Sequence, residues 1–113
     1  MREPNGHLEI GVEAVTAETT VIRADGELDM ATVGMLEEAL EPVARDRGIV
    51  IDLTRCTFLD SSAVRVLVAT SREVDEAGGS LALVACDPTI LRVLEIAAVD
   101  TMVPVHATLA QAL

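Results

Sequence analysis

The chain has 113 residues and a mass of 11.9 kDa, the size of one domain spanning residues 1–113, which excludes a multidomain enzyme. Half of the residues are hydrophobic and 24% are charged, so we expect a folded globular chain rather than a disordered one. Nineteen acidic residues against eight arginines give a net charge of -11, which disfavours binding to nucleic acid or to an anionic membrane.

Two short segments near the N-terminus predict an antiparallel hairpin. Residues 8–14 alternate between apolar and polar side chains, the period of a half-buried strand at or near a sheet edge. Residues 20–24 predict a second strand, and the short polar link before them favours a hairpin. We expect Asp25 and Gly26 to end this second strand.

The first helix is predicted from its apolar spacing. Asp29 is placed to cap it. A proline inside a helix removes a backbone hydrogen bond and clashes with the preceding turn, so Pro42 predicts a kink or the end of the helix. The apolar stripe consists of Val33, Leu36, Leu40 and Val43.

Strands and helices then alternate to the C-terminus. The continuous apolar run at 49–53 is typical of a strand covered on both faces and therefore parallel to its neighbours. The remaining expected segments are a loop at 54–59, a helix from Asp60 to Ala77 stopped by Gly78 and Gly79, a strand at 81–85, a helix begun by Asp87 and Pro88, a short strand at 102–105 and a last helical turn at 107–113.

This order of elements predicts an α/β domain. We expect a mixed, mostly parallel sheet of four to five strands with about four helices, in which only the first strand runs antiparallel. No apolar stretch approaches the roughly 20 residues of a membrane-spanning helix, and residues 1–6 lack an apolar leader segment. The expected location is therefore the cytoplasm.

The cysteines, the histidines and the glycines of the sequence indicate neither a catalytic site nor a cofactor site. Cys56 and Cys86 are 30 residues apart without a CxxC pair, so we interpret them as buried or half-buried free thiols. His7 and His106 have no other ligand at metal-binding spacing, and the chain has no glycine-rich phosphate loop. The sequence therefore predicts no metal site, no cofactor and no enzymatic activity.

Asp60, Ser61 and Ser62 form the most informative segment, because they stand at a predicted helix start. The simplest interpretation is capping, since Asp and Ser are preferred N-cap residues. The functional alternative is phosphorylation of one serine, with the phosphate received by free N–H groups at the positive end of the helix dipole. Both interpretations fit the residues.

Three short motifs stand in order along the chain: Gly26-Glu27-Leu28-Asp29, Val50-Ile51-Asp52-Leu53 and Phe58-Leu59-Asp60-Ser61-Ser62. With these motifs the chain resembles the STAS domain family, and specifically the bacterial anti-sigma factor antagonists. The resemblance covers essentially the whole chain.

The resemblance implies a binding module switched by phosphorylation. Unmodified, it would bind a serine-kinase anti-sigma factor and so release a sigma factor; the kinase would phosphorylate Ser61, or as second choice Ser62, and a serine phosphatase would reverse this. The family usually has glycine where this chain has Ala63, which bears on partner affinity. Neither nucleic acid nor a membrane is expected as a partner.

Further partner-binding candidates surround this segment. Besides Asp60, Ser61, Ser62 and Ala63, they include Glu27, for which the sequence suggests no structural role, and Asp29, for which helix capping is the simpler interpretation. Arg65 follows in the first turns of the helix, where it either offers a charge to the partner or is simply solvated.

Two alternatives remain open at this point. The domain could be a non-switching STAS subunit of a signalling scaffold or of a lipid-transport complex. It could also be a small hydrolase with Ser61 or Ser62 as the nucleophile, which would need a base such as His106 within about 3 Å.

Overall fold

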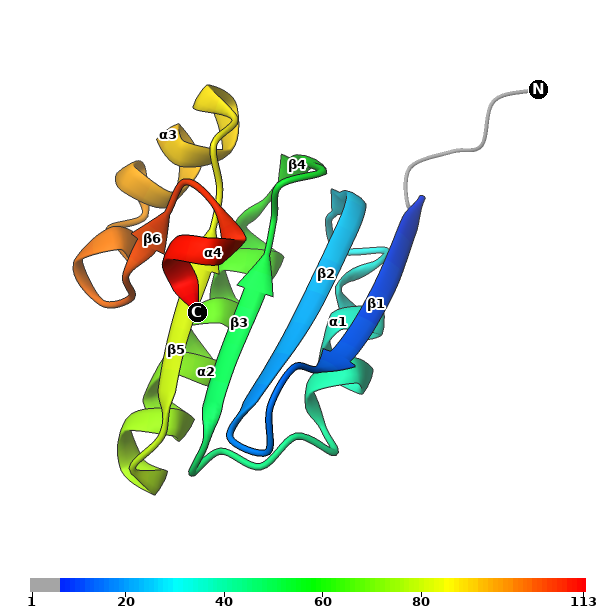
Figure 1. Ribbon diagram of the computed structural model, residues 1–113. Helices are drawn as coiled ribbons and strands as arrows, with labels where there is room; N and C mark the ends of the chain where they lie inside the picture. The colour runs from blue at the N-terminus through cyan, green and yellow to red at the C-terminus, as the bar shows by residue number, and fades with distance from the viewer. Residues whose placement is uncertain (1–6) are drawn as a thin grey trace.

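A computed structural model describes residues 7–113, so the leader-segment prediction for residues 1–6 lies outside the described part. The described chain forms one six-stranded sheet in the order β1-β2-β3-β5-β6, with β4 paired to β2 (Figure 1). The strands are β1 (Leu8–Ala14), β2 (Thr19–Leu28), β3 (Gly48–Asp52), β4 (Cys56–Leu59), β5 (Ser80–Val84) and β6 (Val105–His106). The helices are α1 (Val33–Leu40), α2 (Ser61–Ala77), α3 (Pro88–Ile96) and α4 (Leu109–Ala112), with a 3-10 turn at Val99–Thr101.

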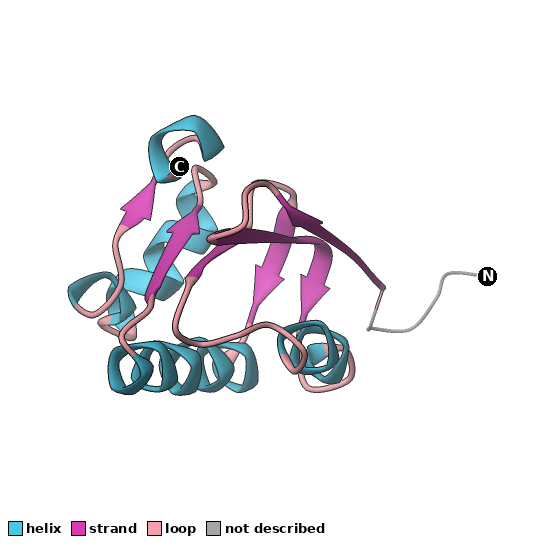
Figure 2. Ribbon diagram, turned by 60° about the horizontal axis from the view of Figure 1, so that its bottom comes forward, coloured by secondary structure: helices cyan, strands magenta, loops and turns pink. Residues whose placement is uncertain are grey.

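The strand directions confirm the predicted α/β fold class. Strand β1 lies at a sheet edge and pairs antiparallel with β2. Every other pair of strands, including β2 with β4, is parallel. Helices α1 and α2 lie on one face of the sheet and α4 on the other (Figure 2). Within residues 7–113, no helix has both the length and the apolar character needed to cross a membrane.

Successive residues of the central strands point into two separate cores. Ile22 and Ile51 belong to the larger core, together with Leu36 of α1 and Leu67 of α2. The smaller core, on the opposite face, consists of Val21, Val50 and Val84 and is covered in part by Leu109 and Ala112 of α4. Strand β3 is therefore buried on both faces, as its continuous apolar sequence predicted.

The predicted helix ends are largely confirmed. Helix α2 begins after its N-cap Asp60 and ends at Gly78, whose φ of 84° is the left-handed conformation that glycine adopts readily. Asp87 caps α3, with Pro88 in its first turn. Helix α1 ends at Leu40, just before Pro42. Proline at this position therefore ends the helix rather than kinking it.

The structure corrects the expected end of β2 and the loop at 54–59. Strand β2 continues through Asp25 and Gly26 to Leu28, because Gly26 takes a φ of 124° within the strand. Residues 56–59 then form β4 against this extension, with a register shift between Gly26 and Glu27. The sheet consequently has six strands rather than four to five.

Smaller corrections concern the C-terminal third and the cysteines. Residues 99–101 form a 3-10 turn, and β6 begins only at Val105, so the last strand is later and shorter than predicted. Helix α4 is confined to Leu109–Ala112 and begins at a capping box made by Thr108 and Gln111. Cys56 is buried, as expected, whereas Cys86 is exposed in the turn before α3.

Gly26 is a position where a side chain is predicted to be costly. A Cβ atom there would lie 2.5 Å from the carbonyl oxygen of His7, and the φ of 124° is strained for an L-residue. We expect Gly26→Ala to lower the free energy of unfolding by about 1–3 kcal/mol in denaturant titrations.

Gly34→Ala provides the matched control. Gly34 is an exposed residue of α1, and a Cβ atom added there would meet nothing within 4 Å, so this variant should be neutral or more stable by up to about 1 kcal/mol. Equal stability of the two variants would contradict the role assigned to Gly26.

Candidate functional site

The candidate site lies where the extended β2 and β4 end side by side. Leu28 of β2 pairs with Leu59 of β4, and the N–H of Asp60 donates to the carbonyl of Leu28 at 3.1 Å. The turn at residues 29–32 follows β2, and helix α2 follows β4. Two segments about 30 positions apart in the sequence therefore meet at one end of the sheet.

The Asp60 carboxylate links these two segments. Its Oδ1 accepts hydrogen bonds from the N–H groups of Ser62 at 2.9 Å and Ala63 at 3.2 Å, and from the hydroxyl of Ser62 at 2.5 Å. Its Oδ2 accepts from the N–H of Met30, in the turn after β2, at 3.1 Å. One side chain therefore caps α2 and holds the neighbouring turn against it.

These contacts keep Asp60 ionised. Partial burial by itself raises the pKa of the carboxyl, but the hydroxyl of Ser62 and the N–H groups of Ala63, Ser62 and Met30 stabilise the anion and together lower the pKa below its usual value. Asp60 is therefore a negative charge at neutral pH, directly before Ser61.

The two serines differ in accessibility. Ser61 is exposed at the first position of α2, and its hydroxyl makes no hydrogen bond within residues 7–113. Ser62 is half-buried and donates its hydroxyl to Asp60. The N–H groups of Ser62 and Ala63, expected from the sequence to be free for a phosphate, are instead occupied by the Asp60 carboxylate.

Ala63 and Asp29 have structural roles. Ala63 is fully buried in the larger core, so its methyl group does not reach the surface. Asp29 is also buried, and its Oδ1 accepts from the N–H groups of Ala31 at 2.9 Å and Thr32 at 3.1 Å. It closes the turn before α1, whereas the helix itself begins after Thr32, so the predicted direct cap of α1 by Asp29 is wrong.

Two exposed apolar side chains beside the serines were not predicted from the sequence. Met30 is 81% exposed and Phe58 49% exposed. Both line a cavity of about 370 Å³, together with Glu27, Asp29, Ala31 and Asp60. No local pattern in the sequence signalled the exposure of Met30 and Phe58, because large apolar side chains are ordinarily buried.

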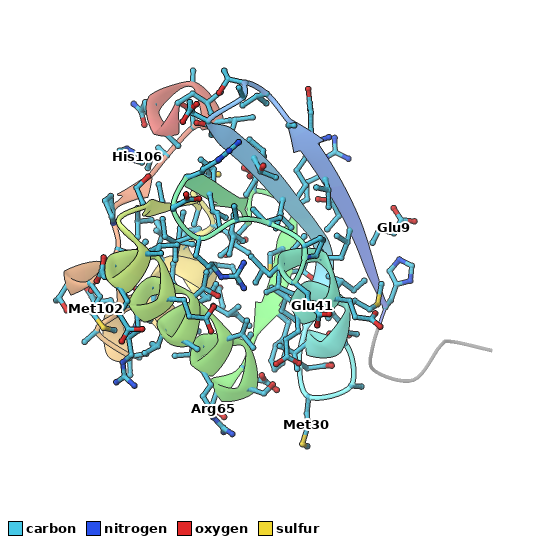
Figure 3. The ribbon with its side chains drawn as sticks, turned by 90° about the horizontal axis from the view of Figure 1, so that it is seen from below. Glu9, Met30, Glu41, Arg65, Met102 and His106 are labelled. Carbon is cyan, nitrogen blue, oxygen red and sulfur yellow. The ribbon has the colours of Figure 1, made fainter. Side chains whose placement is uncertain are left out.

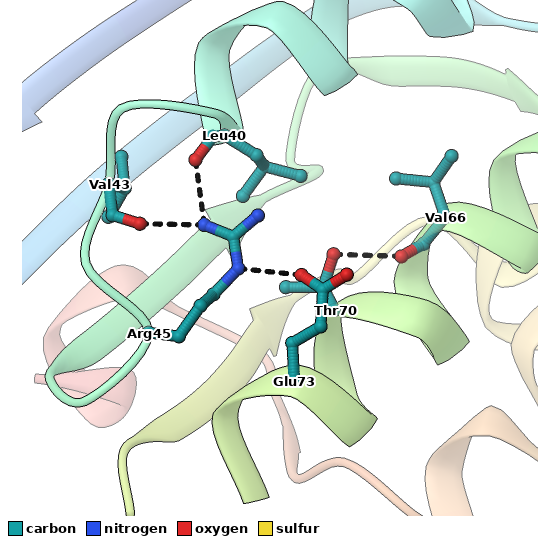
Figure 4. A network of polar contacts seen from close by, with 6 residues as sticks. All are labelled: Leu40, Val43, Arg45, Val66, Thr70 and Glu73. Atoms are coloured by element: carbon teal, nitrogen blue, oxygen red, sulfur yellow. Dashed lines mark hydrogen bonds and ion pairs between the residues drawn. The ribbon is translucent and has the colours of Figure 1, made fainter. Parts of the chain in front are cut away.

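A second hollow, of about 490 Å³, lies between α1 and α2 and has Ser62 and Arg65 among its lining residues. Arg45 helps to hold its two sides together (Figure 4). The Arg45 guanidinium donates to Glu73 of α2 and to the backbone carbonyls of Leu40 and Val43, each at 2.7 Å. Arg65, in contrast, points outward from the start of α2, on the same side as Met30 (Figure 3).

His106, the base named for the hydrolase alternative, lies away from the two serines. His106 lines a different cavity, with Leu94 and Val105, and lies on the opposite side of the molecule from Arg65, which is in the same two turns of α2 as the serines (Figure 3). Across residues 7–113 there is also no group of three or more His, Cys, Asp or Glu side chains arranged to hold a metal ion.

Comparisons with known proteins identify the family. A family model for the STAS domain matches residues 12–112, so the chain belongs to the STAS domain family. Among curated proteins, it is 29% identical over 87 residues to an anti-sigma-B factor antagonist of Staphylococcus aureus, covering 75% of this chain and 81% of that protein.

Solved structures give the same result at the level of the fold. An anti-sigma factor antagonist from Mycobacterium paratuberculosis has a TM-score of 0.86 and 29% identity, over 98% of this chain and 95% of that one. The antagonist SpoIIAA in its unphosphorylated form has a TM-score of 0.78 and 28% identity, over 92% of both chains. The Bacillus SpoIIAA in its phosphorylated form has a TM-score of 0.70 and 28% identity, over 92% of this chain and 96% of that one. The predicted resemblance is confirmed.

The role of Asp60 leads to a pH-dependent prediction. Asp60→Asn should lower the free energy of unfolding at pH 7 by about 1 kcal/mol, because an amide keeps only one acceptor oxygen and cannot serve both Met30 and the helix. The pKa of Asp60 is lowered in the folded state, so the stabilisation that its carboxylate contributes is complete above the ordinary carboxyl pKa. This contribution is lost as the pH falls through the folded-state pKa.

Denaturant titrations between pH 7 and pH 2 measure this difference. Glu38→Gln, which makes the same charge change at an exposed position of α1, is the control and should have little effect at any pH. A deficit of Asp60→Asn that stays constant across the whole range would contradict the assignment of the lowered pKa to Asp60.

Proposed function

We propose that this protein is a cytoplasmic anti-sigma factor antagonist whose binding is switched by phosphorylation of Ser61. In its unmodified form it binds a serine-kinase anti-sigma factor, and the sigma factor is thereby released. The kinase inactivates it by phosphorylating Ser61, and a serine phosphatase restores it. The protein itself has no catalytic role in this scheme.

The observation that carries the proposal is the exposed hydroxyl of Ser61 on a rigid support. The cap by Asp60 fixes the start of α2, while the Ser61 hydroxyl remains unpaired within the described chain. A kinase can therefore reach the oxygen without unfolding the helix. The names of the similar proteins support the same function, and the similar SpoIIAA is described in both unphosphorylated and phosphorylated forms.

The geometry also favours Ser61 over Ser62 as the modified residue. In the transfer, the serine oxygen forms a bond to the γ-phosphorus of ATP, ADP leaves, and the hydroxyl proton goes to a base of the kinase. The hydroxyl of Ser62 already donates a hydrogen bond to Asp60, and Ser62 is half-buried. Its phosphorylation would place two negative groups in direct contact.

The surface around Ser61 has the composition of a protein-binding site. Met30 and Phe58 offer exposed apolar area, and Glu27 and Asp60 place acidic groups beside it. A phosphate of about -1.5 to -2 charges added there would be repelled by Asp60 and would have to be desolvated in the complex. Loss of binding follows without a change of fold.

Binding and phosphorylation can be measured together. Incubated with its cognate anti-sigma factor and ATP, the native protein should gain one phosphate by intact-mass analysis and lose binding in a pull-down. Ser61→Ala should gain none and remain bound, whereas Ser61→Asp should bind at least about tenfold more weakly from the start, the effect of about 1.4 kcal/mol.

Two variants serve as controls. Ser62→Ala should still be phosphorylated, and Ser80→Asp, at the opposite end of the sheet in β5, should bind normally (Figure 1). Normal binding by Ser61→Asp would instead favour a non-switching STAS subunit of a larger assembly. Undiminished labelling of Ser61→Ala would show that the modified residue is another one.

A further inference from the structure

Arg65 stands one helical turn after Ser61 on α2. Both residues are exposed, and side chains four positions apart on a helix lie on the same face, with Cβ atoms about 5–6 Å apart. An acidic group that precedes a basic one by four residues is the favourable order for such a pair. A phosphate on Ser61 would therefore have the guanidinium of Arg65 within reach.

Most of the other donors near Ser61 are already engaged within residues 7–113. The N–H groups of Ser62 and Ala63, and the hydroxyl of Ser62, all donate to the side chain of Asp60. The N–H of Val64 donates to the backbone carbonyl of Asp60 at 3.1 Å. The first turn of α2 thus has little left to offer a phosphate, and the ionised Asp60 repels it.

Arg65 is available, unlike Arg45 in the same hollow. Arg45 is held by Glu73 and by two backbone carbonyls. Arg65 makes no hydrogen bond or ion pair with any residue between 7 and 113, and its side chain extends into solvent (Figure 3). In a protein with a net charge of -11, Arg65 thus offers an unpaired positive charge one helical turn from Ser61.

We propose that Arg65 is the internal counter-ion of the phosphate on Ser61. The guanidinium turns along the helix surface and pairs with the phosphate oxygens, for which its planar set of donors is suited. The same movement withdraws a positive charge from the surface offered to the partner. Phosphorylation therefore alters the surface twice, by adding a negative group at Ser61 and by occupying the cation at Arg65.

This proposal rests on Ser61 being the phosphorylated residue, but its test does not need the kinase. Phosphoserine is incorporated at position 61 during translation by codon reassignment, and the phosphate is titrated by ³¹P NMR. A paired cation favours the dianion, so Arg65→Gln should raise the second pKa of the phosphate by roughly 0.3 pH units or more. Arg65→Lys should restore part of the native value.

Arg72→Gln is the matched control, because Arg72 is exposed on α2 about three turns beyond Ser61 and should not affect the titration. The difference between native protein and Arg65→Gln should also shrink in about 1 M NaCl, which screens surface ion pairs. Circular dichroism confirms that each variant keeps its helices.

Identical phosphate titrations in native protein and Arg65→Gln would overturn the role of Arg65, as would an equal shift in Arg72→Gln. These outcomes are independent of the proposed function. If the shift is found but the kinase does not modify Ser61, the proposed switch fails while the pairing stands. If the kinase modifies Ser61 but no shift is found, only the pairing fails.

Discussion

The candidate site depends on one carboxylate that serves two segments. Asp60 uses one oxygen to cap α2 and the other to hold the N–H of Met30 in the turn after β2. Its negative charge is stabilised by four donors, so the cap persists at neutral pH. This arrangement leaves the hydroxyl of Ser61 directed to solvent from a fixed helix end. A modification there can change recognition while the backbone beneath it stays in place.

The sheet brings the two segments to the same place. Because Gly26 adopts a positive φ, β2 continues far enough for Leu28 to pair with Leu59, and the turn after β2 then lies beside the start of α2. The core behind the site is aliphatic and is filled in part by Ala63. Phe58 and Met30 remain outside it, and together with the acidic groups they give the surface its mixed character. Strand pairing therefore positions the site, and the hydrogen bonds of Asp60 hold its two segments together.

Local patterns in the sequence were sufficient for the main elements. The start at Asp60 and the stop at Gly78 predicted α2 correctly, and the buried run at 49–53 predicted a parallel central strand. These signals act over a few residues, so they can be interpreted without knowledge of the fold. The α/β class followed from the order of elements, and the position of the first strand at or near the sheet edge followed from the alternation of residues 8–14.

The features that were missed depend on contacts between distant residues. An Asp-Gly pair usually marks the end of a strand. Only the pairing of Gly26 with β1 and β4 shows that β2 continues through it. The hydrogen bonds from the N–H groups of α2 to Asp60 join residues two or three positions apart. The hydrogen bond from Met30 to Asp60, in contrast, joins residues 30 positions apart. Asp29 looked like a helix cap because its turn immediately precedes α1. Such contacts emerge only when the segments are assembled in space.

The most direct test of this account is a pH titration of the backbone amides by ¹H–¹⁵N NMR. If Asp60 links the two segments, the amide signals of Met30 and Ala63 shift together with a single midpoint below the ordinary aspartate pKa of about 3.9. An Ala63 signal that titrates while that of Met30 does not would show that the two segments are held independently, and would contradict the central claim.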